Sequence, residues 1–141
     1  MQGNEILQPL IAMILVTLVV WTALYVRRIR FLKTHRIHAQ KVSTPEKVAA
    51  VIPEHVQNPA NNFKNLFELP VLFYALCLYL YVTGTVERPD VIAAWVFFGF
   101  RVVHSAIHCT VNIVMARFLA YSVAALALWF MLARAVWGVL P

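Results

Sequence analysis

Four apolar segments divide the chain, and shorter polar stretches separate them. The segments run over about residues 6–26, 59–83, 91–113 and 117–136. Each has about 20 residues, the length that an α-helix needs to cross the hydrocarbon core of a bilayer. The pattern therefore predicts an all-α membrane protein, a bundle of four transmembrane helices that forms a single domain over residues 1–141.

Composition and charge support this class and suggest an orientation. Hydrophobic residues make up 62% of the chain and charged residues only 13%, which excludes an ordinary soluble globular protein. Seven of the twelve basic residues lie between the first and second segments, and an eighth lies in the polar start of the second: Arg27, Arg28, Arg30, Lys33, Arg36, Lys41 and Lys47, and then Lys64. Basic loops stay on the cytoplasmic side and attract anionic lipid head groups. We therefore expect a cytoplasmic loop over residues 27–58, with both termini outside.

The basic residues do not indicate nucleic-acid binding, because no recognition fold accompanies them. The first segment does not have the form of a cleaved signal peptide either, since its basic residues follow the apolar run instead of preceding it. The basic loop, together with the lack of any long extramembrane stretch, suggests an integral, multi-pass protein of a bacterial inner membrane.

Caps and prolines predict where the helices begin and end. Thr44 followed by Pro45 is typical of a helix start inside the basic loop. Asn58 followed by Pro59 repeats this signal and predicts the start of the second long helix. Pro70 should bend that helix just past Glu68, because proline lacks the N–H that a helix needs.

Polar residues recur at helical spacing where the second apolar segment begins. Asn58, Asn61, Asn65 and Glu68 are three or four residues apart, so we expect them on one face of a helix. A carboxylate or an amide that points into a membrane bundle is costly unless it is paired. This face therefore predicts a functional site.

The third segment carries a matching polar face. Arg101, His104 and His108 have the spacing i, i+3, i+7. A short turn joins the second and third helices, so they should be antiparallel neighbours with Arg101 within reach of Glu68. A buried Glu68–Arg101 ion pair that only holds the bundle together is one interpretation. The convergence of at least five polar side chains favours a polar ligand near the cytoplasmic side.

Metal and nucleophile chemistry are weaker interpretations of the same residues. His104 and His108 are an i, i+4 pair, and Glu68 would be a third ligand for zinc, but a recognisable zinc motif is missing. We therefore expect no metal. The chain also has no Ser/His/Asp or Cys/His set and no glycine-rich phosphate loop.

These motifs resemble the MAPEG family, the membrane-associated proteins of eicosanoid and glutathione metabolism. The resemblance rests on four short spans, a basic first loop, Asn65-x-x-Glu68 before a proline, and Arg101-x-x-His104 followed by Arg117. It implies a four-helix bundle that assembles as a homotrimer. It also implies that glutathione lies between neighbouring subunits near the cytosolic face, as the co-substrate of a transferase or peroxidase.

The resemblance also implies roles for single residues. Asn65 and Glu68 match the asparagine and glutamate that bind the glutathione peptide, the glutamate facing the amino group. Arg101 and His104 match the start of the family's third-helix motif. Arg117 matches the arginine at the start of the fourth helix, the candidate for holding the catalytic thiolate.

Two positions depart from the family pattern. Asn61 stands where the second-helix motif usually has an arginine, and His108 stands where a tyrosine usually follows Arg101 by seven residues. An asparagine cannot form the bidentate charged pair that an arginine offers to a carboxylate. His108 keeps a hydrogen-bonding group, and Lys64 would replace part of the lost charge.

Two main functions follow from the sequence. The first is a membrane enzyme that activates the thiol of glutathione against a lipophilic electrophile or hydroperoxide arriving through the bilayer. The second is a non-catalytic protein of the same fold that binds a lipid or a partner protein, and Asn61 favours it. A small scaffold or transporter component, with a structural Glu68–Arg101 pair, is a third possibility.

Overall fold

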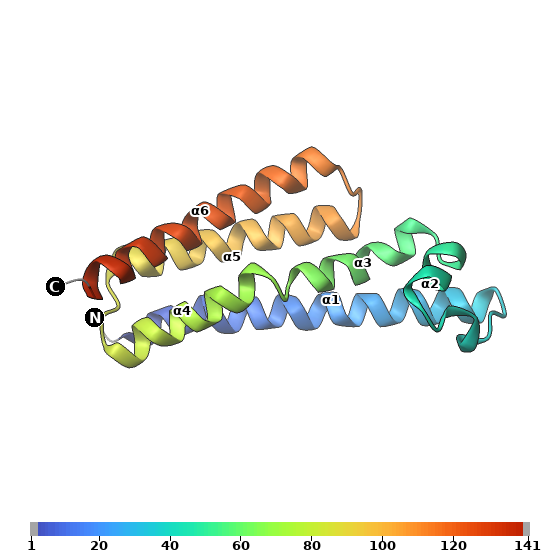
Figure 1. Ribbon diagram of the computed structural model, residues 1–141, viewed down its shortest axis with the longest axis horizontal. Coiled ribbons are helices and arrows are strands. Elements are labelled where there is room, and N and C mark those ends of the chain that lie inside the picture. Colours follow the sequence, from blue (N-terminus) through green and yellow to red (C-terminus); the bar gives the residue numbers. More distant parts are fainter. Residues whose placement is uncertain (1–2, 140–141) are drawn as a thin grey trace.

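The computed structural model describes residues 3–139, and every regular element in that range is helical. Figure 1 shows an elongated bundle in which α5 and α6 form a hairpin beside α1, α3 and α4. The residue-3 and residue-139 ends lie at one end of the bundle, and the loop that contains α2 lies at the other. The elements are η1 (Gly3–Ile6), α1 (Leu7–Thr34), η2 (Ala39–Val42), α2 (Pro45–Val51), α3 (Glu54–Asn65), α4 (Leu69–Thr83), α5 (Arg88–Cys109) and α6 (Val114–Val139).

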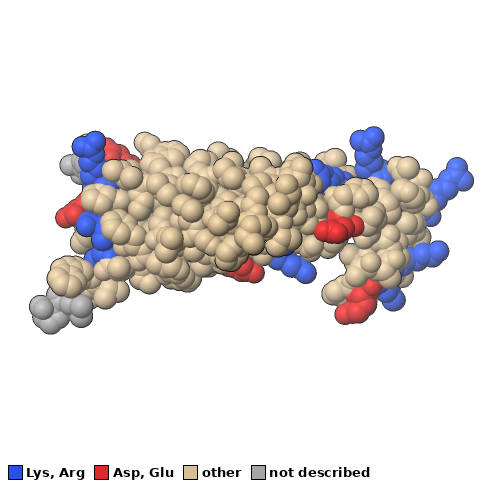
Figure 2. Space-filling view, turned by 90° about the horizontal axis from the view of Figure 1, so that it is seen from above, with Lys and Arg blue, Asp and Glu red and all other residues tan. Residues whose placement is uncertain are grey.

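Four helical stretches of the described chain are long and apolar enough to cross a membrane. They are Gly3–Thr34, Glu54–Thr83, Arg88–Cys109 and Val114–Val139. In the face seen in Figure 2, charged side chains gather toward the two ends and a broad uncharged band lies between them. The expected all-α fold with four spanning helices is confirmed, and the protein is an integral, multi-pass membrane protein.

The first helix continues well beyond the expected span of residues 6–26. α1 has 28 residues, which corresponds to about 42 Å against a hydrocarbon core of about 30 Å. Arg27 lies in its last two turns and donates hydrogen bonds to the carbonyl oxygens of His55 and Cys109. The first part of the basic loop is thus helical, and it ties α1 to the start of α3 and the end of α5.

The second spanning stretch is interrupted. α3 begins at Glu54, so the expected start at Asn58 is wrong and Pro59 lies inside the helix. The helix stops at Asn65 and resumes as α4 at Leu69, with Pro70 in the first turn of α4. Because Pro70 has no N–H to offer to the carbonyl of Leu66, the expected bend becomes a break of three residues.

Helix ends in the loops follow local capping chemistry. The Oγ1 of Thr44 accepts a hydrogen bond from the N–H of Lys47, which confirms the predicted cap of α2. Gly84 ends α4 with φ of 68°, a left-handed conformation that glycine adopts at little cost. α5 spans Arg88–Cys109 and α6 begins at Val114, so the third helix ends four residues before the expected position 113.

The apolar core lies between the two halves of the bundle. Phe73 of α4 and Phe97 of α5 are fully buried and stacked, with ring centroids 4.3 Å apart. Ala94 and Ala124 are fully buried on α5 and α6, and such small side chains let membrane helices approach closely. This packing fixes how α3 and α4 face α5, and so positions the polar residues described next.

Candidate functional site

Polar side chains of α3 and α5 face each other near the end of the bundle that carries the basic loop. Buried members of this group are Asn58, Asn62, Arg101, His104, Ser105 and His108. The Oγ of Ser105 donates to Oδ1 of Asn62 at 3.4 Å, and Nδ2 of Asn65 lies 3.5 Å from Nδ1 of His108. A polar cluster inside a membrane bundle is expensive and marks a candidate binding site.

Arg101 is the most unusual member of the cluster. Its side chain is fully buried, and its Nη2 donates to the carbonyl oxygen of Asn65 at 3.0 Å. That oxygen lies at the end of α3, where its only backbone partner in the described chain is the N–H of Glu68 at 3.4 Å, so Arg101 helps to cap α3. The ring of Tyr121 lies 5.5 Å from the guanidinium carbon, within range of a cation–π contact.

The rest of the Arg101 guanidinium lacks hydrogen bonds. Its Nε and Nη1 atoms are buried and have no partner among the described residues. Within residues 3–139 the only ion pairs join Arg134 to Glu87 and Asp90, so the interpretation of Glu68 and Arg101 as a structural ion pair is wrong. A buried cation with free N–H groups and no carboxylate is suited to bind an anionic group.

His104 links α5 to the start of α6. Its Nδ1 lies 2.9 Å from the carbonyl oxygen of Arg117. Since a carbonyl can only accept, Nδ1 carries a proton, and in the neutral ring Nε2 is an acceptor. Nε2 is buried and has no partner within the described chain. The ring of His108 packs edge-on against the ring of His104, with centroids 5.6 Å apart.

Arg117 is half-buried at the start of α6. Its Nη1 donates to Oδ1 of Asn112, in the turn between α5 and α6. Its backbone carbonyl accepts from His104, so both its side chain and its backbone are tied to neighbouring polar groups. The guanidinium therefore has a fixed place beside the cluster.

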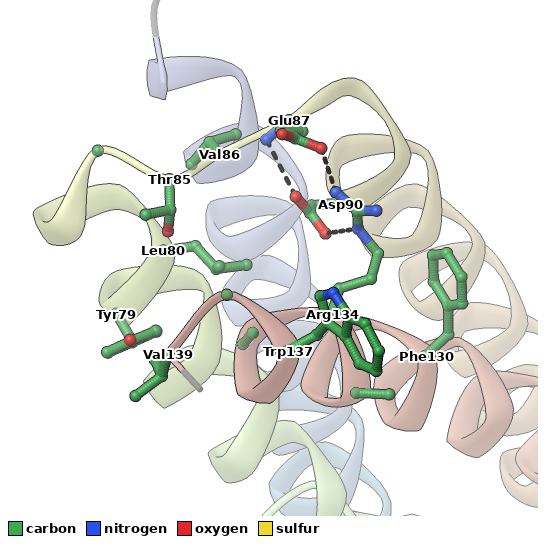
Figure 3. Close-up of a pocket in the computed structure, with 14 residues that line it drawn as sticks. Tyr79, Leu80, Thr85, Val86, Glu87, Asp90, Phe130, Arg134, Trp137 and Val139 are labelled. Atoms are coloured by element: carbon green, nitrogen blue, oxygen red, sulfur yellow. Dashed lines mark hydrogen bonds and ion pairs between the residues drawn. The ribbon is translucent and has the colours of Figure 1, made fainter. Parts of the chain in front are cut away.

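A cavity of about 610 Å³ lies at the opposite end of the bundle. Figure 3 shows Arg134 of α6 reaching across to Glu87 and Asp90 at the start of α5. The carboxylate of Asp90 is satisfied here, because Oδ1 accepts from Nε of Arg134 at 2.8 Å and Oδ2 accepts from the backbone N–H of Glu87 at 3.0 Å. This cluster joins two helix ends, and it is separate from the polar cluster of α3 and α5.

The family model for the MAPEG family matches residues 6–137, nearly the whole chain. The chain therefore belongs to the MAPEG family. Comparisons with curated proteins and with solved structures gave no match. MAPEG membership and the four spanning helices together make this protein a membrane protein of that family.

The MAPEG motif residues of α3 divide between the interior and the surface. Asn65 is half-buried and contacts the α5 residues Arg101 and His108. Asn61 and Glu68 are exposed, so the expected common face of Asn58, Asn61, Asn65 and Glu68 is wrong. The helix break separates Glu68 from the other three, because the spacing rule holds only within one continuous helix. Asn61 lies within α3, and the rotation of this helix in the bundle turns Asn62 inward in its place.

Sequence reasoning missed Asn62, which is fully buried and bonded to Ser105. Its signal was present, since Asn58, Asn62 and Asn65 have the spacing i, i+4, i+7. This stripe pairs with the predicted face of α5. Asn112 was also missed, and no local pattern marks it.

The two histidines do not gather further metal-binding groups around them. In the described part of the chain, no three His, Cys, Asp or Glu side chains come close enough to hold one ion. Nδ1 of each imidazole already contacts a protein group. The arrangement is better suited to hydrogen bonding with an organic ligand that has both acceptor and donor groups.

Proposed function

We propose that this MAPEG protein is a membrane-embedded glutathione-dependent transferase or peroxidase. The observation that carries the proposal is the fully buried Arg101, whose Nε and Nη1 lack partners among residues 3–139. Glutathione carries two carboxylates, and an arginine binds a carboxylate through charge-assisted hydrogen bonds. The membership of the chain in the MAPEG family gives this chemistry its prior support.

Each polar group of the cluster has a role in this proposal. Arg101 binds a carboxylate, and Asn65 and His108 bind the peptide part. The acceptor Nε2 of His104 receives a hydrogen bond from a ligand N–H or S–H. Glu68 faces the amino group of glutathione, and Asn61 offers an amide where the family motif has an arginine.

Arg117 is the proposed catalytic residue. A free thiol has a pKa near 8.5 and is mostly protonated at neutral pH, and a nearby cation raises its thiolate fraction. The thiolate sulfur then forms a bond to the electrophilic carbon of a lipophilic substrate, whose leaving group takes the bond electrons. With a hydroperoxide, the sulfur bonds to the terminal oxygen as the O–O bond breaks, and the alkoxide takes up a proton and leaves as the alcohol. The sulfenic acid that remains reacts with a second glutathione to give the disulfide and water.

We further propose a homotrimer in which glutathione is held between subunits. Glu68 and Asn61 are exposed on the single chain, next to the exposed apolar side chains Phe67 and Val71. A site completed by a second subunit would cover them and give Glu68 a cationic partner. The basic loop on the cytoplasmic side of a bacterial inner membrane would then place the site within reach of soluble glutathione.

A non-catalytic role is the second candidate. The observation that favours it is Asn61, which is exposed and uncharged where the family motif usually has an arginine. A weakened clamp for the glutathione carboxylate would leave a polar cluster that binds a lipid or a partner protein. A lipid that binds without any thiol consumption would support this candidate.

Calorimetric titration of detergent-purified protein with glutathione tests the main proposal. We expect binding in the micromolar to millimolar range that Glu68→Ala abolishes. Glu46→Ala, which removes an exposed glutamate of α2, is the matched control and should bind like the wild type. Folded wild-type protein that binds no glutathione would refute the proposal.

A further inference from the structure

Asn112 occupies a demanding position in the turn between α5 and α6. Its φ is 50°, a left-handed conformation that is rare for residues with a side chain, although asparagine tolerates it better than most. Its backbone N–H donates to the carbonyl of Ile107 at 2.7 Å and closes the end of α5. The side chain is thereby aimed at the space between α3 and α6.

The amide of Asn112 joins a carboxylate to a guanidinium. Its Nδ2 donates to Oε1 of Glu54 at 2.7 Å and to Oδ1 of Asn58 at 3.4 Å. Its Oδ1 accepts from Nη1 of Arg117. An amide suits this place because it has donors on one side and an acceptor on the other. One side chain therefore connects the first turns of α3 and of α6.

The amide also separates two opposite charges. Glu54 and Arg117 bond to the same side chain, and within residues 3–139 they form no ion pair with each other. A carboxylate in direct contact with Arg117 would offset most of its field at a nearby group, because two unit charges interact more strongly as they approach. The neutral amide holds the guanidinium of Arg117 in place and does not offset its positive charge, which can then act on a nearby group.

We propose that Asn112 is a positioning residue that holds Arg117 and keeps Glu54 from neutralising it. The part of the inference that concerns thiolate stabilisation rests on the proposed function. The part that concerns the placement of Arg117 does not. Asn112 acts only through Arg117, so it should change the ionisation of a bound thiol more than the affinity for glutathione.

Two substitutions separate the side chain from the backbone. Asn112→Gly removes the amide and keeps the left-handed backbone, which glycine adopts freely. Asn112→Asp keeps the shape and places a carboxylate against Arg117, and combining it with Glu54→Gln avoids a repulsion between two carboxylates. The matched control is Arg36→Gly, because Arg36 has nearly the same φ of 52° in the basic loop.

The first readout needs no glutathione. Full-length protein in detergent is treated with phenylglyoxal, and mass spectrometry compares the modification rate at Arg117 with that at the exposed Arg30. Losing a charge-assisted hydrogen bond should raise the relative rate at Arg117 about tenfold in Asn112→Gly. The Asn112→Asp/Glu54→Gln variant should lower it, and Arg36→Gly should match the wild type. An unchanged rate in both Asn112 variants would overturn the placement.

The second readout is the pH profile of glutathione conjugation to a model electrophile. In Asn112→Asp/Glu54→Gln the apparent pKa of the bound thiol should rise by about one unit, since the new carboxylate opposes the thiolate. A profile identical to the wild type would overturn the charge-separating role. If the wild type shows no thiol chemistry while the Arg117 modification rates change as expected, the proposed function fails and the placement of Arg117 by Asn112 holds.

Discussion

Replacing Arg101 with methionine should stabilise the protein and abolish the binding of an anionic ligand. The guanidinium is fully buried, and its Nε and Nη1 have no partner in the described residues. A buried unsatisfied donor costs about 1–3 kcal/mol, and more when it is charged. Methionine has a similar length and no polar atom to desolvate, so it removes this cost.

The gain is reduced by the contacts that the variant loses. The hydrogen bond from Nη2 to the carbonyl of Asn65 is worth about 1.5–3 kcal/mol, and the cation–π contact with Tyr121 about 0.5–1 kcal/mol. Exchanging a buried charge for a well-packed apolar group commonly stabilises a protein by about 1–4 kcal/mol. We therefore expect a net gain of about 2 kcal/mol, or a Tm higher by about 6–8 °C for a chain of this size.

Thermal unfolding in detergent, followed by far-ultraviolet circular dichroism, measures this change. Arg134→Met is the control, because Arg134 is bonded to both Glu87 and Asp90 and its loss should lower the Tm. A lower Tm for Arg101→Met would refute the reasoning. It would mean that the guanidinium has a partner in the assembled protein, and a carboxylate of a neighbouring subunit would be the first to test.

Two further predictions concern the stability of the bundle and use the same unfolding assay. Phe73→Ala should destabilise the protein by about 3–5 kcal/mol, because Phe73 is buried and stacked on Phe97. The control is Phe118→Ala, whose side chain is 57% exposed, and an equally small change of Tm in both variants would contradict this prediction. Gly84→Ala should cost about 1 kcal/mol of stability, because φ is 68° there. Gly99→Ala lies in α5 with open space around the new Cβ and should stabilise the protein by up to about 1 kcal/mol. Equal shifts of Tm for both glycine variants would show that backbone conformation is not the cause.

The break between α3 and α4 shows where sequence reasoning reached its limit. Pro70 marks the interruption, and its physical reason is local, since one missing N–H leaves the carbonyl of Leu66 without a helical partner. The buried polar stripe runs through Asn62 instead of Asn61, because the rotation of α3 in the bundle turns Asn62 inward and leaves Asn61 exposed. Asn58 and Pro59 resemble a helix start in isolation, and only the packing of α3 against α1 and α5 makes them helix interior.

The sequence by itself determined the class of the protein, its four spans, the capped start of α2 at Thr44, and the polar face of α5. These features depend on local composition, spacing and backbone chemistry, which a single segment carries. Tertiary structure alone decided that Arg101 bonds the carbonyl of Asn65 instead of Glu68, and that Asn112 stands between Glu54 and Arg117. Such contacts depend on the relative depth and rotation of packed helices, where a shift of a few ångströms changes the partner of a side chain.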